Sequence, residues 1–119
     1  MKEVDIKVRT FQFAVGVVKF CKLLIEGEKE FILSKQLLRS ATSIGANVRE
    51  ARNAESKADF IHKMSIVQKE TSETIYWLEL IRETEINITD KIEPFVKEAN
   101  ELLKIIRTII LNTKRNLNK

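Results

Sequence analysis

Apolar residues recur along the first part of this chain at steps of three and four, the spacing that places side chains on one face of an α-helix. Residues 5–26 hold two such sets, which lie about 120° apart around the helix axis. They are Phe11, Ala14, Val18, Cys21 and Ile25, and Phe13, Val17, Phe20 and Leu24. Gly27 follows as a candidate left-handed cap. The pattern predicts a helix with more apolar surface than one packing seam needs.

A second helix is predicted over residues 29–54. Its apolar positions keep the helical spacing and are Leu33, Leu37, Ala41, Ile44, Val48 and Ala51. The middle of this segment is small, with Ala41, Gly45 and Ala46, and would let a neighbouring helix approach closely. Glycine lowers helix stability by about 1 kcal/mol relative to alanine, and close packing of a neighbouring helix could offset that loss.

A third helix is predicted over residues 57–84, because Ser56 followed by Asp59 resembles an N-cap with an acid in the first turn. Its main face consists of Phe60, Met64, Val67, Thr71, Ile75 and Leu78. A second apolar patch surrounds Glu73 and consists of Ile66, Trp77, Leu80 and Ile81. This helix, like the first, has two apolar sides.

A fourth helix is predicted over residues 90–116. Thr89 or Asp90 can cap it, and Pro94 is tolerated in the first turn because early amides have no intrahelical acceptor. Its apolar stripe consists of Phe95, Ala99, Leu102, Ile106 and Ile109.

Short polar turns between four amphipathic helices predict an all-α fold, an antiparallel up-down-up-down four-helix bundle. We expect one domain over residues 1–119, because no linker or low-complexity segment interrupts the pattern. With 119 residues and 44% apolar content the chain can bury a core without disulfides or metal. Three glycines and one proline disfavour an all-β fold.

The chain shows no targeting signal. Acids stand near its N-terminus where a signal peptide would not have them, and no apolar run approaches the roughly 20 residues of a membrane span. Cys21 is the single cysteine and suits a reducing compartment, where it behaves as a small hydrophobic residue. We expect a cytoplasmic protein with no membrane partner.

Several separated blocks, in order, resemble a known family. The first, residues 36–50, reads Gln-Leu-Leu-Arg-Ser-Ala-Thr-Ser-Ile-Gly-Ala-Asn-Val-Arg-Glu, and residues 56–60 and 70–78 follow it. The opening Arg9-Thr10-Phe11 with Phe13-Ala14-Val15 is similar too. Together, from about Val8 to Ile86, the chain resembles the bacterial four-helix bundle proteins encoded in intervening sequences of 23S ribosomal RNA genes.

The resemblance implies a four-helix protomer that assembles into a ring, a pentamer, in the bacterial cytoplasm, with no established enzymatic activity. Distant relatives of that family include the accessory protein of diversity-generating retroelements, a basic pentameric barrel that engages nucleic acid and a reverse transcriptase. These distant relatives suggest RNA binding by analogy only, since proteins of the same fold can have different functions.

Polar residues follow one side of the second predicted helix, next to its apolar stripe. They are Arg39, Ser43, Asn47 and Glu50, at steps of four, four and three. One interpretation is a binding groove. The other, which we favour, is an interhelix polar seam in which Arg39 or Asn47 meets Glu70 or Glu73 of the third helix and fixes the register.

No catalytic set is recognisable. Asp59 and His62 have the i, i+3 spacing of di-iron bundles, but such a site needs two of these motifs and the chain has one histidine. A Gly-rich phosphate loop, a cysteine cluster and a serine with a suitable base are missing. Ser40 and Ser43 are expected to bond back to their own helix. We expect no enzyme activity, no metal and no cofactor.

Basic residues gather at the C-terminal end, although the net charge of +4 is modest. Lys97, Lys104 and Arg115 fall at nearly the same angle on the fourth helix, with Arg107 and Lys114 adjacent. One interpretation is a nucleic-acid surface that contacts phosphates without sequence preference. The other is an ordinary solvated face. A ring would repeat the patch and add avidity.

The surplus apolar surface has two explanations. Each helix of a bundle touches two neighbours, which widens its buried face, or part of the surface lies between subunits. Because aromatic anchors favour association, we predict an oligomer interface that includes Phe13, Phe20, Trp77 and Leu80.

Three functional hypotheses remain open. The first is a non-enzymatic homo-oligomer that binds structured RNA, such as ribosomal RNA or its precursor, through the basic surface. The second is a scaffold that binds a protein partner through apolar surface left exposed after assembly. The third is the product of a mobile ribosomal RNA insert with little host function.

Overall fold

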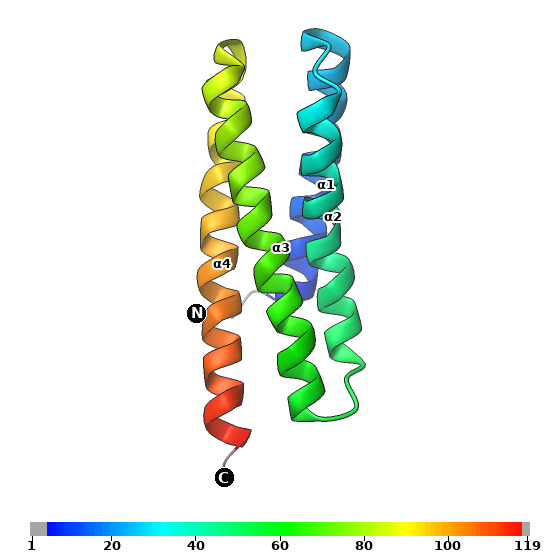
Figure 1. Cartoon of the computed structure of the whole chain (residues 1–119), viewed down its shortest axis with the longest axis vertical. Coiled ribbons are helices and arrows are strands. Elements are labelled where there is room, and N and C mark those ends of the chain that lie inside the picture. Colours follow the sequence, from blue (N-terminus) through cyan, green and yellow to red (C-terminus); the bar gives the residue numbers. More distant parts are fainter. Residues whose placement is uncertain (1–4, 118–119) are drawn as a thin grey trace.

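The computed structural model describes residues 5–117 and consists of four long helices that run alternately up and down (Figure 1). They are α1 (Ile6–Glu28), α2 (Ile32–Arg52), α3 (Lys57–Thr84) and α4 (Thr89–Leu117), with a short 3-10 helix, η1 (Ile86–Ile88), before α4. No strand occurs among these residues. The predicted all-α four-helix bundle is confirmed, and each predicted helix boundary lies within three residues of the observed one.

Each helix packs against its neighbours in the chain, and α4 closes the bundle against α1 across a wider seam. Helices α1 and α3 therefore occupy diagonally opposite corners, and Figure 1 shows α1 behind α2. The core runs the length of the bundle. Its largest fully buried side chains include Leu24, Leu37, Ile44, Met64, Leu78, Ile92, Leu102 and Ile106. Burying each contributes about 1.5–3 kcal/mol.

The structure separates the two apolar sides of α1. Phe13, Val17, Phe20 and Leu24 face the core. Of the other set Cys21 is buried, whereas Phe11 is 52% exposed on the outside of the bundle. Ala14, Val18 and Ile25, which lie between Phe11 and Cys21 around the helix axis, are half-buried. One apolar set of α1 thus builds the core, and most of the other lies at its edge or outside it.

Gly27 does not cap α1, which corrects that expectation. The helix continues to Glu28, and Lys29 takes the left-handed conformation with φ 57° while its N–H donates to the carbonyl of Leu24. A side chain in this region costs about 1 kcal/mol. Residues 29–31 form the turn, so α2 begins at Ile32, where the Glu30 carboxylate accepts from the Leu33 N–H at 2.6 Å.

The small middle of α2 has the predicted effect. A Cβ built on Gly45 would lie 3.5 Å from the carbonyl oxygen of Thr10, an ordinary van der Waals contact, so α1 and α2 approach closely there. Thr10 is fully buried, and its hydroxyl donates to the carbonyl of Ile6 at 2.8 Å. The buried hydroxyl at this crossing therefore has a partner within its own helix.

The predicted start of α3 is also confirmed. The Ser56 hydroxyl accepts from the Asp59 N–H at 3.0 Å, and the Asp59 carboxylate accepts from the Glu55 N–H at 3.1 Å. Two amides that lack helical acceptors are satisfied in this way.

The wider α1–α4 seam is filled by aromatic rings. The Phe95 ring centroid lies 5.2 Å from that of Phe20 and 6.3 Å from that of Phe13. A Cβ on Gly16 would come within 2.9 Å of the Phe95 ring, so the glycine makes room for it. Phe13 and Phe20 are only 5% and 4% exposed. Their prediction as subunit-interface residues is wrong, because they pack on Phe95 inside the protomer.

Trp77 and Leu80, the other two residues of that predicted interface, are half-buried on α3. Within residues 5–117 we find no helix whose length and hydrophobicity would allow it to span a bilayer.

Candidate nucleic-acid interface

Arg9 of α1 binds two acids of α4. Its guanidinium donates to the Glu98 carboxylate through Nε and Nη2, both at 2.7 Å, and to Glu101 Oε2 at 2.6 Å. The hydrogen bonds from Arg9 to Glu98, opposed in part by burial, raise the pKa of the arginine above its ordinary value. Since bidentate pairs are strong and well oriented, Arg9 holds both carboxylates in place and compensates one of their two negative charges.

A third acid of α4 is bound from α3. Arg82 donates to the Glu93 carboxylate at 3.2 Å and lies 3.8 Å from the carboxylates of Glu79 and Glu83. From residue 102 to residue 117 the chain contains no acid. Three acids of α4, Glu93, Glu98 and Glu101, are thus engaged by arginines of other helices.

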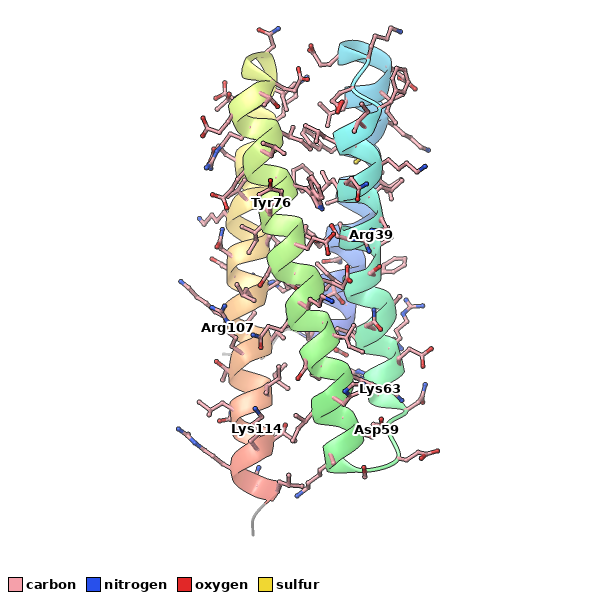
Figure 2. The ribbon with its side chains drawn as sticks, viewed as in Figure 1. Arg39, Asp59, Lys63, Tyr76, Arg107 and Lys114 are labelled. Carbon is pink, nitrogen blue, oxygen red and sulfur yellow. The ribbon has the colours of Figure 1, made fainter. Side chains whose placement is uncertain are left out.

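The five basic residues predicted on the fourth helix all lie on the surface of α4. They are Lys97, Lys104, Arg107, Lys114 and Arg115. None of them forms an ion pair with another residue in the 5–117 range. Arg107 and Lys114 are labelled on α4 in Figure 2, and both are exposed. From Lys97 to Arg115 this basic α4 face extends about 27 Å, at 1.5 Å per residue.

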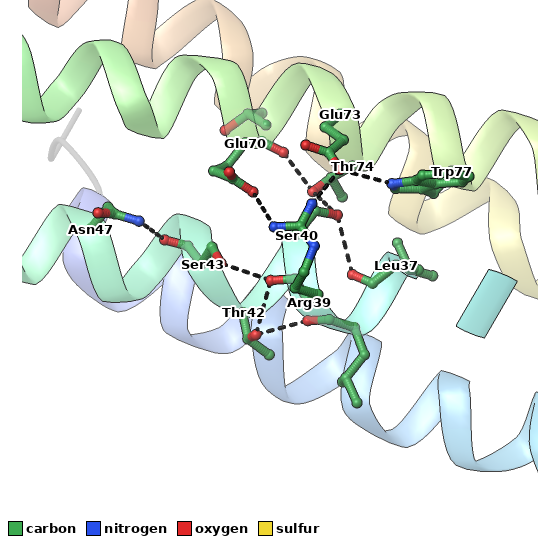
Figure 3. A network of polar contacts seen from close by, with 12 residues as sticks. Leu37, Arg39, Ser40, Thr42, Ser43, Asn47, Glu70, Glu73, Thr74 and Trp77 are labelled. Carbon is green, nitrogen blue, oxygen red and sulfur yellow. Dashed lines mark hydrogen bonds and ion pairs between the residues drawn. The ribbon is translucent and has the colours of Figure 1, made fainter. Parts of the chain in front are cut away.

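The predicted polar seam between α2 and α3 is present in part (Figure 3). The Arg39 guanidinium donates to the carboxylates of Glu73 and of Glu70, the latter at 3.5 Å. The indole N–H of Trp77 donates to the same Glu73 carboxylate at 3.3 Å. These contacts join the middle of the two helices. The seam therefore serves packing between helices, as the favoured interpretation expected.

The remaining seam residues do not cross to α3. The Ser43 hydroxyl donates to the carbonyl of Arg39, and the Asn47 amide donates to the carbonyl of Ser43, both at 2.8 Å (Figure 3). Glu50 is exposed. Of the two residues expected to meet Glu70 or Glu73, Arg39 does so, whereas the Asn47 amide bonds back to its own helix.

The seam should be sensitive to acid. The hydrogen bond from Arg39 lowers the pKa of Glu73, with that from Trp77 adding to it. Because the pKa of Glu73 is lower in the folded state than its ordinary value of about 4.3, the ionised carboxylate stabilises the fold at any pH above that ordinary value. This stabilisation is lost as the pH falls through the pKa that Glu73 has in the folded protein. We expect Arg39→Gln to reduce the thermal midpoint at pH 7 and to have a smaller effect at an acidic pH at which Glu73 is protonated. Thermal unfolding followed by circular dichroism checks this, and an equal effect at both pH values would contradict it.

A buried hydroxyl pair was missed by the sequence analysis. The Thr74 hydroxyl lies 2.9 Å from the Ser40 hydroxyl across the α2–α3 contact, and each also bonds a carbonyl of its own helix. Both residues are fully buried. Helical spacing places Ser40 beside the apolar stripe of α2 and Thr74 beside that of α3, and this spacing is the one feature of the sequence that could have predicted their burial.

The other chemical candidates are engaged in the fold or buried. Asp59 accepts from Lys63 at 3.1 Å besides capping α3, and no group of three or more potential metal ligands gathers among residues 5–117. Cys21 is buried, and burial raises the pKa of its thiol to about 11. At neutral pH this thiol is protonated and a poor nucleophile.

Comparison with known proteins identifies the family. The profile of the 23S rRNA-intervening sequence protein family matches residues 2–108. The chain belongs to this family. The family resemblance inferred from residues 36–50, 56–60 and 70–78 is thereby confirmed.

A solved structure supports the same assignment. It is a protein of unknown function from the S23 ribosomal protein family of Bacteroides thetaiotaomicron, with 46% sequence identity and a TM-score of 0.85. The match covers 89% of this chain and 98% of that chain. No curated protein matches the chain. Neither the family description nor that of the Bacteroides protein names an enzymatic activity.

The family match includes most of the basic α4 face. Lys97, Lys104 and Arg107 lie within residues 2–108, whereas Lys114 and Arg115 lie beyond them. The C-terminal end of the face is therefore outside the part of the chain that defines its membership of the 23S rRNA-intervening sequence protein family.

Proposed function

We propose that this protein is a non-enzymatic, cytoplasmic homo-oligomer that binds structured RNA through the basic α4 face. The observation that carries the proposal is the charge arrangement of α4. The five cations of the basic α4 face lack ion-pair partners among residues 5–117, whereas Glu98 and Glu101 are bound by Arg9. Unpaired cations along one side of a helix are available to phosphates.

The composition of the face favours structured RNA over single strands. Proteins that bind single strands stack bases on exposed aromatic side chains. The only aromatic residue of α4, Phe95, is half-buried in the α1–α4 seam. A face of cations without stacking rings can contact the phosphates of a double-stranded region, with little preference for sequence.

The family supports ribosomal RNA as the kind of RNA. Its description refers to intervening sequences of 23S rRNA, and we propose ribosomal RNA or its precursor as the ligand on that basis. We also propose a ring, a pentamer, as the assembled form. Copies of the basic α4 face in one assembly would bind a long RNA through several weak contacts, which increases the apparent affinity.

The salt dependence of binding tests this function. If three phosphates are neutralised per site, raising the salt from about 50 to about 200 mM should lower the affinity for an RNA hairpin by about 40-fold. Fluorescence anisotropy with a labelled hairpin of about 20 base pairs measures this change. Affinity that does not depend on salt, or no binding by the assembled protein, would contradict the proposal.

The alternative is a protein-interaction scaffold. The exposed side chains of Phe31 and Ile32, at the start of α2, favour it because they form apolar surface outside the bundle. A pull-down that recovers one protein and no nucleic acid would support the scaffold. Deletion without any phenotype would agree with a third possibility, the product of a mobile insert with little host function.

A further inference from the structure

The outside of α1 carries apolar side chains that remain partly exposed in the protomer. Val8, Phe11 and Val15 follow each other at steps of three and four and are between 38% and 52% exposed. They point away from the core, because the buried residues of α1 lie on the opposite side of the helix. We refer to Val8, Phe11 and Val15 as the α1 outer face.

Positive charge surrounds the α1 outer face. Residues 6–25 contain three lysines and no acid, and their one arginine, Arg9, is bound by Glu98 and Glu101 of α4. Lys7 stands four residues before Phe11, and Lys19 stands four residues after Val15, so both are neighbours on the helix surface. Arg49 of α2 lies over the Phe11 ring, 5.1 Å from its centroid. An apolar centre is thus framed by cations.

The outside of α3 has the same apolar character with the opposite charge. Tyr76 is 57% exposed, and its ring meets that of Trp77 edge-on with centroids 5.0 Å apart. Leu80, one helical turn further on, is half-buried. We refer to Tyr76, Trp77 and Leu80 as the α3 outer face.

Acids frame the α3 outer face. Glu79 and Glu83 are exposed beside it, and together with Glu93 they share the single guanidinium of Arg82. Three carboxylates on one cation leave an excess of negative charge. The α3 outer face is therefore an apolar and aromatic surface with an acidic rim.

We propose that the α1 outer face of one protomer docks on the α3 outer face of a second copy of this chain. The two faces cannot meet within one protomer, because α1 and α3 occupy diagonal corners of the bundle. Between copies, the aromatic and aliphatic centres are buried while lysines face glutamates. Opposite charges at the rim favour this pairing and disfavour the alternatives.

Charge also selects against docking of like faces. Two α1 outer faces would bring lysines against lysines, and two α3 outer faces would bring Glu79 and Glu83 against their own copies. The contact is therefore heterologous, head to tail, and leaves one free face of each kind on a pair. Such contacts close into a ring where the rotation between neighbouring copies allows it, and otherwise continue as an open filament.

The inference rests on the proposed assembly and is independent of RNA binding. The test uses two variants of the full chain, with nucleic-acid absorbance recorded. Phe11→Glu with Val15→Glu places acids in the α1 outer face, and Tyr76→Lys with Glu79→Lys places cations on the α3 outer face. We expect the wild type to have the mass of an oligomer and each variant alone to have the mass of one chain, by light scattering after size exclusion.

Mixing the two variants is the decisive step. Each retains the face that the other lacks, so the equimolar mixture should form a complex with the mass of at least two chains. Variants that remain assembled alone, or a mixture that remains monomeric, would overturn the proposed faces. A monomeric wild type would overturn assembly as well, whereas RNA binding is measured separately.

A milder pair keeps the test free of folding artefacts. Phe11→Ser and Tyr76→Ser alter exposed side chains only, so helical circular dichroism should match that of the wild type. Each should shift the oligomer toward single chains at equal protein concentration. As a control, Ser65→Lys changes an exposed residue of α3 three turns before Tyr76 and should leave the mass unchanged. Loss of the oligomer in this control would contradict the proposed contact.

Discussion

Replacing Lys104, Arg107 and Arg115 together by glutamate is expected to weaken the binding of an RNA hairpin by at least about 100-fold. Each cation near a polyanionic surface contributes about 1 kcal/mol, and reversal adds repulsion to the lost attraction. All three side chains are exposed on α4, so the fold should not change. Fluorescence anisotropy at about 50 mM salt, where electrostatic binding is strongest, measures the effect.

A matched variant separates the basic α4 face from net charge. Lys29, Lys69 and Lys91 are exposed but do not belong to the basic α4 face, and replacing them by glutamate changes the charge by the same six units, from +4 to −2. If RNA binds the proposed face, this variant should lose only a small part of the affinity. Equal losses in both variants would mean that overall charge, and not the α4 face, governs binding.

The second large effect is expected from Phe95→Ala, which should lower the free energy of unfolding by about 2–3 kcal/mol. The ring contacts Phe13 and Phe20 and lies against Gly16, so its removal leaves a void where α1 and α4 meet. The expected change is toward the lower end of such substitutions because the ring is half-buried. Urea denaturation followed by circular dichroism measures it, and the thermal midpoint should fall by about 10 °C.

Phe31→Ala is the matched control for this change. The same atoms are removed from a side chain that is 58% exposed in the turn before α2, so the loss should stay below about 1 kcal/mol. A similar loss at both positions would show that Phe95 does not hold the α1–α4 seam together.

The helices could be predicted because their signals are local. The apolar stripe of α3 and the Ser56 cap with Asp59 depend on residues within a few positions of each other, and both appear in the structure. The end of α1 could not be predicted in the same way. Gly27 has the better propensity for a left-handed cap, but the turn into α2 places that conformation on Lys29. Tertiary geometry outweighed local preference at this point.

The candidate site was less predictable, because its properties depend on partners distant in sequence. The cations of α4 were visible from helical spacing, yet the engagement of Glu98 and Glu101 by Arg9 was not. Phe13 and Phe20 were assigned to a subunit interface because periodicity shows that a residue is apolar without showing what covers it. Phe95, which covers both, lies more than seventy residues away in the chain.

Because Arg9 of α1 binds Glu98 and Glu101 of α4, the net charge at the surface of α4 depends on the presence of α1. Arg9 and Glu98 are 89 positions apart in the chain. A proteolytic cut or deletion that removed the first turn of α1 would release two carboxylates next to Lys97 and Lys104 and so weaken the attraction of that surface for polyanions. Trimming one terminus of this protein would therefore change the electrostatic behaviour of the other.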